Sequence, residues 1–255
     1  MKYYSHISLN LFFLSIIISA DFPDKTQLIR KNSVAKTIGR EDRKDGVHSG
    51  NRVLTRIYNH GAIGDLSSSF SGVYPIGSGH AYIFEFSPII AASVVDANGF
   101  RKHIISDGTI GLTDNSPEGT PWGFEPLTGY ANPNQENLAM SDNENSWPDS
   151  WPNRPSDWDG EWNGQYGKYV RADQESYFVV DDYYNSEFEF WPDENDIPQD
   201  TTAAPDNHRR GLGIQLDVRG YQWNHPAAED ILIVTYWITN VGTSVLDSVV
   251  FGMYG

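Results

Sequence analysis

The chain has 255 residues, contains no cysteine and carries a formal net charge of −16 at pH 7. The absence of cysteine excludes a disulfide framework and a cysteine-based zinc site. Between residues 107 and 200 there are 21 Asp and Glu against 3 Lys and Arg, a local net charge of −18 that disfavours binding to nucleic acid. Apolar residues make up 39 % of the chain, and glycine, proline and aromatic residues are plentiful, which is typical of short strands joined by many turns.

The N-terminus has the pattern of a signal peptide over residues 1–20. Lys2 supplies a positive end, Leu9 to Ile18 is an apolar run, and Ser19-Ala20 offers small residues before a cleavage at Asp21. The apolar run is too short to span a membrane comfortably. No later stretch is long and apolar enough to span one, so the mature chain is expected outside the cytoplasm without a transmembrane segment.

Residues 21–51 are polar and show no sustained period, which predicts a linker or arm. Strand patterns begin at residue 52, and residues 52–255 form the expected β-rich region. Its sub-parts, residues 52–140 and 165–255, are separated by an acidic loop rich in tryptophan.

A β-hairpin is predicted in the first sub-part. Tyr82, Phe84 and Phe86 alternate along one face of the first strand, and Pro88 is expected to bend or interrupt it. Asn98-Gly99 supplies the positive φ that a tight turn needs, and the chain returns as a second strand.

The loop from Ser141 to Gly164 holds four of the eight tryptophans, six carboxylates and three prolines. Prolines exclude a long helix or a central strand here, and long ordered loops are usually functional. Indole faces and carboxylates together suit a sugar or a cation. The alternative is that the rings form a small core of their own. The candidate ligand-binding residues are Trp147, Trp151, Trp158 and Trp162.

The C-terminal part shows the clearest strand patterns. Buried strand is predicted at Tyr177 to Val180, and a half-exposed strand at 187–190. Leu212 to Arg219 alternates apolar and polar residues, as a strand with one wet face does. Ile231 to Thr239 is apolar on both faces, which predicts a central covered strand, with Val245 to Tyr254 as its partner. With no helical period anywhere, the pattern predicts an all-β protein, a β-sandwich of immunoglobulin-like or related type with long loops rich in Trp, Asp and Pro.

The order of short motifs resembles that of large, functionally uncharacterised secreted surface proteins of Gram-negative bacteria, of the kind exported by the type IX system. The resemblance implies export, a β-rich surface protein, and a longer chain with C-terminal modules. It carries no catalytic residue. The motifs are Arg52-Val53, Asn59-His60-Gly61, Ile63-Gly64, Tyr74-Pro75, Gly77-Ser78-Gly79, Trp122, Glu125-Pro126-Leu127, Gly129-Tyr130, SWPDSWP, GEWNGQYG, ADQESYFVVDD and RGYQW.

Two acidic sets have hard oxygen ligands in loops. Asp157, Asp159 and Glu161 alternate around Gly160, an arrangement that predicts a site for a calcium ion (Ca2+), although the EF-hand pattern is absent. Asp193, Asn195 and Asp196 form a second candidate, and simple solvation is the alternative for both. Asp181 and Asp182 are neighbours on a strand and are expected to point to opposite faces. The histidines have no ligand spacing and are expected in surface or loop positions, namely His48, His60, His80, His103, His208 and His225.

Three functions stay open. The first is a secreted or cell-surface module with a structural or adhesive role and no catalysis, whose partner is another cell-surface protein. The second is a glycan-binding module that holds extracellular polysaccharide on the tryptophan loop. The third is a glycoside hydrolase with two loop carboxylates as acid and base or nucleophile. Buried tryptophans favour the first function and an open cleft lined by them favours the second.

The sequence stops at Gly255 directly after an apolar strand pattern. A two-stranded hairpin alone is marginal in water, so Val245 to Tyr254 needs further strands or a covering sheet. The expectation is an N-terminal portion of a longer protein, whose last strand lies at a sheet edge.

Overall fold

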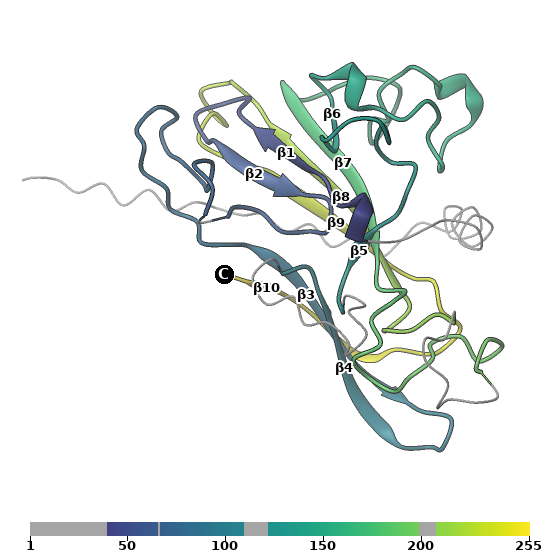
Figure 1. Cartoon of the computed structure of the whole chain (residues 1–255). Helices are drawn as coiled ribbons and strands as arrows, with labels where there is room; N and C mark the ends of the chain where they lie inside the picture. Colours follow the sequence, from purple (N-terminus) through teal and green to yellow (C-terminus); the bar gives the residue numbers. More distant parts are fainter. Residues whose placement is uncertain (1–39, 66, 110–121, 199–207) are drawn as a thin grey trace, which may run out of the picture.

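The computed structural model describes residues 40–65, 67–109, 122–198 and 208–255 (Figure 1). These residues form ten strands in three sheets, with single-turn 3-10 helices between some of them. The predicted all-β class is confirmed, and the immunoglobulin-like type stays a prediction. The expected signal peptide, residues 1–20, lies outside the described residues. Within the described ranges, no helix has the length and apolar character needed to cross a membrane.

The smallest sheet pairs β1, Asp45–His48, with β2, Thr55–Tyr58, in antiparallel register. The single turn η2, Arg40–Asp42, precedes it. Strand structure is thus present before residue 52, because β1 lies inside the stretch expected to be a polar arm. Two of the four β1 residues, Gly46 and His48, are buried in the fold.

The second sheet has three strands in the order β10-β3-β4, formed by β10, Asp247–Tyr254, β3, Ser87–Val95, and β4, Arg101–Asp107. β3 and β4 are the predicted hairpin, and Gly99 at its turn has a φ of 82°. The predicted run does break, because Tyr82, Phe84 and Phe86 lie outside β3, which begins at Ser87. Pro88 itself is the second residue of β3 and pairs with Met253 of β10.

The third sheet has five strands. Its main path is β5, Glu125–Pro126, then β7, Gln174–Asp181, then β8, Ile214–Gln222, then β9, Ile233–Asn240. The short strand β6, Ala139–Met140, also pairs with β7. The sub-parts expected at residues 52–140 and 165–255 are interleaved, because both contribute strands to this sheet and to the three-stranded sheet.

Two strand predictions at the C-terminal end were wrong. β9 is an edge strand of the five-stranded sheet rather than a central one. β10 does not return beside β9 but pairs with β3 in the other sheet. The turn after β9 redirects the chain, because Thr243 and Ser244 donate backbone hydrogen bonds to Pro192 O and Val241 donates one to Gly213 O. The expectation that the last strand lies at a sheet edge is confirmed, since β10 pairs with β3 alone in its sheet.

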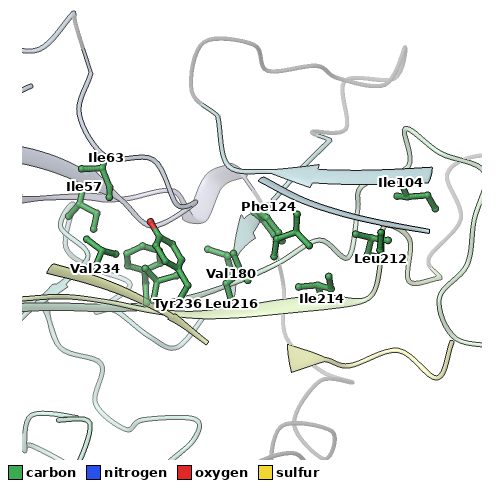
Figure 2. Close-up of a cluster of buried hydrophobic side chains, with 14 of the residues drawn as sticks. Ile57, Ile63, Ile104, Phe124, Val180, Leu212, Ile214, Leu216, Val234 and Tyr236 are labelled. Atoms are coloured by element: carbon green, nitrogen blue, oxygen red, sulfur yellow. The ribbon is translucent and has the colours of Figure 1, made fainter. Parts of the chain in front are cut away.

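One apolar core lies between the sheets. The inner face of the five-stranded sheet contributes Val180, Leu216 and Tyr236 (Figure 2). Ile57 of β2 and Ile104 of β4 contribute from the opposite layer. All five side chains are at most 2 % exposed. Because burial of apolar area is the main favourable term in folding, this contact is what holds the layers together.

The opposite, outer face of the five-stranded sheet was predicted to be wet along residues 212–219. This prediction was wrong, because Gln215 and Arg219 on that face are buried. A loop that includes Asn163 covers Arg219, whereas Gln215 donates a hydrogen bond to Asp181 on the neighbouring strand. The strand predicted at 187–190 is also absent, and turns take its place. There the carbonyl oxygens of Phe188 and Phe190 accept hydrogen bonds from the Arg210 guanidinium instead of from a neighbouring strand.

His48 is buried within β1, contrary to the prediction that the histidines occupy surface or loop positions, whereas His60 is buried but lies in a turn, as a loop position allows. His60 Nδ1 lies 3.0 Å from Gly108 O. His48 Nε2 lies 2.9 Å from Ser176 Oγ of β7 and links the two-stranded sheet to the five-stranded one. Burial lowers the pKa of His48 from 6.5 to about 4, against a smaller opposing effect of Gln222.

The depressed pKa of His48 predicts acid sensitivity. Between pH 6.5 and about 4 the unfolded chain binds a proton that the folded chain excludes, so the free energy of unfolding falls as the pH falls. The expected loss from this group is about 3 kcal/mol. Urea unfolding of the wild type and of His48→Gln at pH 7 and pH 4 measures it. An equal loss in both proteins would contradict the prediction.

Candidate functional site

The segment Ser141–Gly164, here called the Trp loop, lies on the outer face of the five-stranded sheet and contains no strand. Its chain direction is set by two single-turn 3-10 helices, η3, Glu144–Ser146, and η4, Ser156–Trp158. Pro155 immediately precedes η4, and Gly160 follows it with a φ of 75°, a conformation that favours glycine. Proline and glycine therefore fold the loop back on itself.

The four predicted tryptophans lie close together. Trp151 is 3 % exposed and Trp162 is 2 % exposed, whereas Trp147 and Trp158 are partly buried around them. The Trp162 ring centroid lies 5.4 Å from that of Trp147 and 5.8 Å from that of Trp151. Trp151 also contacts Tyr177 of β7, at 5.8 Å between centroids. The rings form a second, smaller core between loop and sheet.

The indole N–H groups of three of these rings have hydrogen-bond acceptors. Trp147 Nε1 donates to Met140 O at 2.7 Å, and Trp151 Nε1 donates to Glu161 O at 2.9 Å. Trp162 Nε1 donates to Glu175 Oε2 on β7, also at 2.7 Å. Buried indoles need such partners, so these contacts fix the orientation of the rings as well as their depth.

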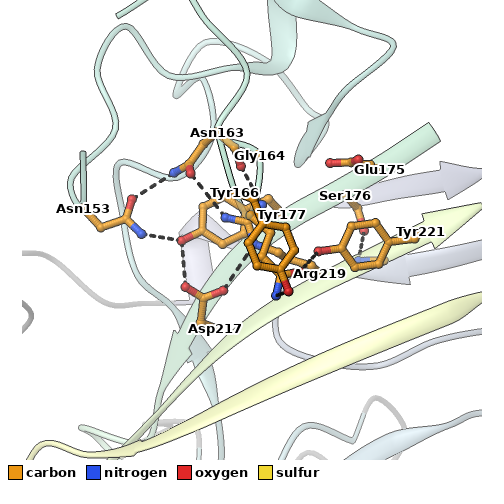
Figure 3. Close-up of polar contacts among 12 residues, drawn as sticks. Asn153, Asn163, Gly164, Tyr166, Glu175, Ser176, Tyr177, Asp217, Arg219 and Tyr221 are labelled. Carbon is orange, nitrogen blue, oxygen red and sulfur yellow. Dashed lines mark hydrogen bonds and ion pairs between the residues drawn. The ribbon is translucent and has the colours of Figure 1, made fainter. Parts of the chain in front are cut away.

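Beside the rings, a polar network joins the loop to β7 and β8 (Figure 3). The Arg219 guanidinium carbon lies 3.7 Å from the Tyr177 ring centroid, and its Nη1 donates to Asn163 O at 2.5 Å. Tyr177 Oη donates to Asp217 Oδ2 at 3.0 Å and accepts from Asn153 Nδ2 at 2.7 Å. Arg219 is 4 % exposed in total. The network therefore neutralises a buried positive charge.

Burial shifts the acid–base behaviour of this network. It raises the pKa of the Tyr177 phenol well above its usual range, with the charge of Asp217 acting in the same direction. Burial also raises the pKa of Tyr221 to about 12. For Arg154, whose guanidinium carbon lies 4.6 Å from the Trp158 ring centroid, burial lowers the pKa. The phenols stay protonated at neutral pH and serve as hydrogen-bond donors.

The residues predicted to bind calcium do not form a cluster in the described part of the chain. Asp157, Asp159 and Glu161 are exposed, and Asp157 Oδ2 forms an ion pair with Lys168 Nζ at 2.9 Å. Asp193 Oδ1 accepts a hydrogen bond from Asn195 N. Within residues 40–65, 67–109, 122–198 and 208–255, no group of three or more His, Asp or Glu side chains is arranged to hold a metal ion.

Asp181 and Asp182 point apart, as predicted from strand geometry. Arg209 Nη1 and Nη2 donate to the Asp181 carboxylate at 2.7 and 3.1 Å. Asp182 accepts from Ser106 Oγ at 2.8 Å and from the backbone N–H of Leu212 at 2.6 Å. Burial, then the charge of Asp181, raises the pKa of Asp182. The two carboxylates therefore take part in separate structural networks.

A second group of aromatic side chains, beyond the end of the Trp loop, was not selected from the sequence. Tyr166 and Tyr169 follow the loop, and Trp223 follows β8. Tyr221 lies beside them, and its ring stacks on the Trp223 ring with 5.8 Å between the centroids. The available signal was four aromatic residues, two in GQYGKYVR and two in YQW, but these two separate stretches share no strand or helix period.

Comparisons of the chain with protein-family models, with curated proteins and with solved structures find no match.

The packing of the Trp loop gives a direct prediction about stability. Replacing Trp162 by Phe shrinks a buried ring and removes the hydrogen bond to Glu175, so the free energy of unfolding should fall by about 2–4 kcal/mol. Trp158→Phe is the matched control at a partly buried ring and should cost less than about 1 kcal/mol. Urea unfolding measures both. Equal losses in the two variants would contradict the assignment of Trp162 to the small core.

Proposed function

We propose that this chain is a β-rich module of a secreted or cell-surface protein of a Gram-negative bacterium, with a structural or adhesive role and no catalysis. Its expected partner is another cell-surface protein or an extracellular polysaccharide. The signal-peptide pattern at residues 1–20 and the resemblance to proteins exported by the type IX system support the location. The single observation that carries the role is the burial of Trp151 and Trp162 against the sheet.

Buried rings favour a structural role for the Trp loop over direct ligand binding. At 3 % and 2 % exposure, Trp151 and Trp162 have no face open to a sugar. Their removal from water stabilises the loop and covers Arg219 and Tyr177 on the sheet. The loop therefore has the properties of a cap that makes the sheet rigid.

Two buried carboxylates of β7, Glu175 and Asp181, also favour a role without catalysis. Glycoside hydrolysis needs two carboxyl groups facing the scissile bond across an open site. Glu175 instead accepts hydrogen bonds from Trp162 Nε1 and from the backbone N–H groups of Arg171 and Ala172. Asp181 is held by Arg209 and by Gln215 Nε2. Both carboxylates are occupied by the fold itself.

The location and role are tested together in the source cells. Antibody against the chain should label intact cells, and deletion of the gene should reduce attachment of the cells to a surface. Restoring the gene with Asp157→Asn and Asp159→Asn should restore attachment, because the proposed role needs no catalytic carboxylate in the loop. Labelling that appears only after cell lysis, or release of reducing sugar from polysaccharide by the purified wild type, would contradict the proposal.

Calcium binding by Asp157, Asp159 and Glu161 stays a prediction. An ion there would have to displace Lys168 from Asp157 and draw the exposed carboxylates together. A ligand that binds only the folded state raises the melting temperature. Melting curves in millimolar calcium and in chelator test this, with Asp159→Asn as the variant expected to abolish the shift. Identical wild-type curves under both conditions would contradict calcium binding.

A further inference from the structure

Four aromatic residues beside the Trp loop, Tyr166, Tyr169, Tyr221 and Trp223, lie close together and are here called the aromatic patch, in which Tyr221 is buried and supports the other three. Tyr166 is 67 % exposed and Tyr169 is 48 % exposed, whereas Trp223 is half-buried. Tyr221 Oη donates to Gln165 Oε1 at 2.7 Å, and Gln165 Nε2 donates to Tyr166 Oη at 3.0 Å. The patch thus joins the segment after the loop to the end of β8, where Tyr166 and Tyr221 are visible in Figure 3.

Arg171 holds the two exposed tyrosines. Its guanidinium carbon lies 5.3 Å from the Tyr166 ring centroid and 4.9 Å from the Tyr169 ring centroid. Its Nη2 donates to Tyr169 Oη at 2.5 Å. Gly167 permits this packing, because a Cβ there would come within 2.3 Å of Cε1 of Tyr169. The rings are therefore held in place before any ligand arrives.

The patch is also tied to the sheet. The backbone N–H of Arg171 donates to Glu175 Oε1 at 2.7 Å, and Glu175 is the residue that accepts from Trp162. Trp223 Nε1 donates to Arg171 O at 3.2 Å. The patch is thus connected through Glu175 to the buried Trp162 ring of the Trp loop. A site that is ordered in advance loses less conformational entropy on binding.

The chemistry of the patch indicates its ligand. Flat aromatic faces alternate with phenol hydroxyls, the Gln165 amide and the Arg171 guanidinium. A pyranose ring has the matching alternation, with apolar C–H faces and hydroxyl edges. Protein–protein interfaces also contain Tyr, Trp and Arg, and the hydroxyl and amide groups between the rings favour a sugar here. The chain as a whole carries a formal net charge of −16, which disfavours anionic polymers.

From this arrangement we propose that the aromatic patch binds a neutral polysaccharide by stacking sugar rings on Tyr166, Tyr169 and Trp223. The proposal rests on the adhesive role above for its choice of an extracellular ligand. Under this proposal the sugar binds to the rings of the aromatic patch and not to the buried rings of the Trp loop. Arg171 and Gln165 supply hydrogen bonds to the hydroxyl groups, and the sheet fixes the spacing of the rings.

Affinity electrophoresis of the full chain tests the proposal, with gels containing hydroxyethylcellulose, xylan or galactomannan as neutral polymers and alginate as the anionic one. At least one neutral polymer should retard the wild type more than alginate does. Tyr166→Ala and Tyr169→Ala should each raise the dissociation constant about tenfold. Tyr166→Phe keeps the ring and should bind within about threefold of the wild type. Tyr82→Ala, at a 62 % exposed tyrosine outside the patch, is the matched control and should bind like the wild type.

Two outcomes would overturn the proposal. One is the absence of retardation by every neutral polymer. The other is retardation that Tyr166→Ala and Tyr169→Ala leave unchanged while their near-ultraviolet circular dichroism matches the wild type. Self-association that is lost in Tyr166→Ala, without any sugar binding, would assign the patch to a protein contact instead. If the antibody labels intact cells but no neutral polymer binds, the sugar-binding proposal is rejected and the proposed location stands. If a neutral polymer binds but intact cells are not labelled, only the proposed location is rejected.

Discussion

The buried positive charge of Arg219 is the constraint on which the outer layer of this protein depends. A charge removed from water costs several kcal/mol unless it is paired and hydrogen-bonded. Arg219 meets this requirement with the Tyr177 ring, the Asn163 carbonyl and Asp217, whose Oδ1 lies 3.7 Å from Nε. Because Asn163 belongs to the Trp loop and the others to the sheet, neither part satisfies the charge alone. The loop and the sheet stabilise each other.

This dependence explains why the strand predictions succeeded on one side of the sheet and failed on the other. The alternation of Ile214, Leu216 and Val218 identified the inner face, because apolar periodicity directly reflects burial in a core. The same alternation made Gln215 and Arg219 look solvated. A local pattern shows polarity, whereas burial of a polar side chain depends on a covering segment more than 50 residues away, as Asn163 is from Arg219.

A short connection did not by itself predict strand partners. The hairpin of β3 and β4 follows from Asn98-Gly99, whereas β9 and β10 appeared to be partners because they are adjacent in sequence. Their separation depends on contacts with Pro192 and Gly213 that no local pattern contains.

The candidate site was likewise predicted only in part from the sequence. The sequence correctly predicted a long loop without strands at Ser141–Gly164. It could not decide whether the rings face water, because tryptophan has both an apolar body and a polar N–H. The aromatic patch had no periodic signal, since its members come from two separate segments, around Tyr169 and Trp223. Only the fold brings such residues together.

The pairing of β10 with β3 has a consequence for the order of folding. Tyr254 pairs with Ser87, so the three-stranded sheet is completed by residues far apart along the chain. Contacts of such long range are slow to form, because the entropy of closing the intervening chain is lost first. During synthesis, β3 cannot pair with β10 until residues 247–254 have left the ribosome. Until then that edge of β3 has unpaired backbone groups, and an unpaired edge invites pairing with another chain.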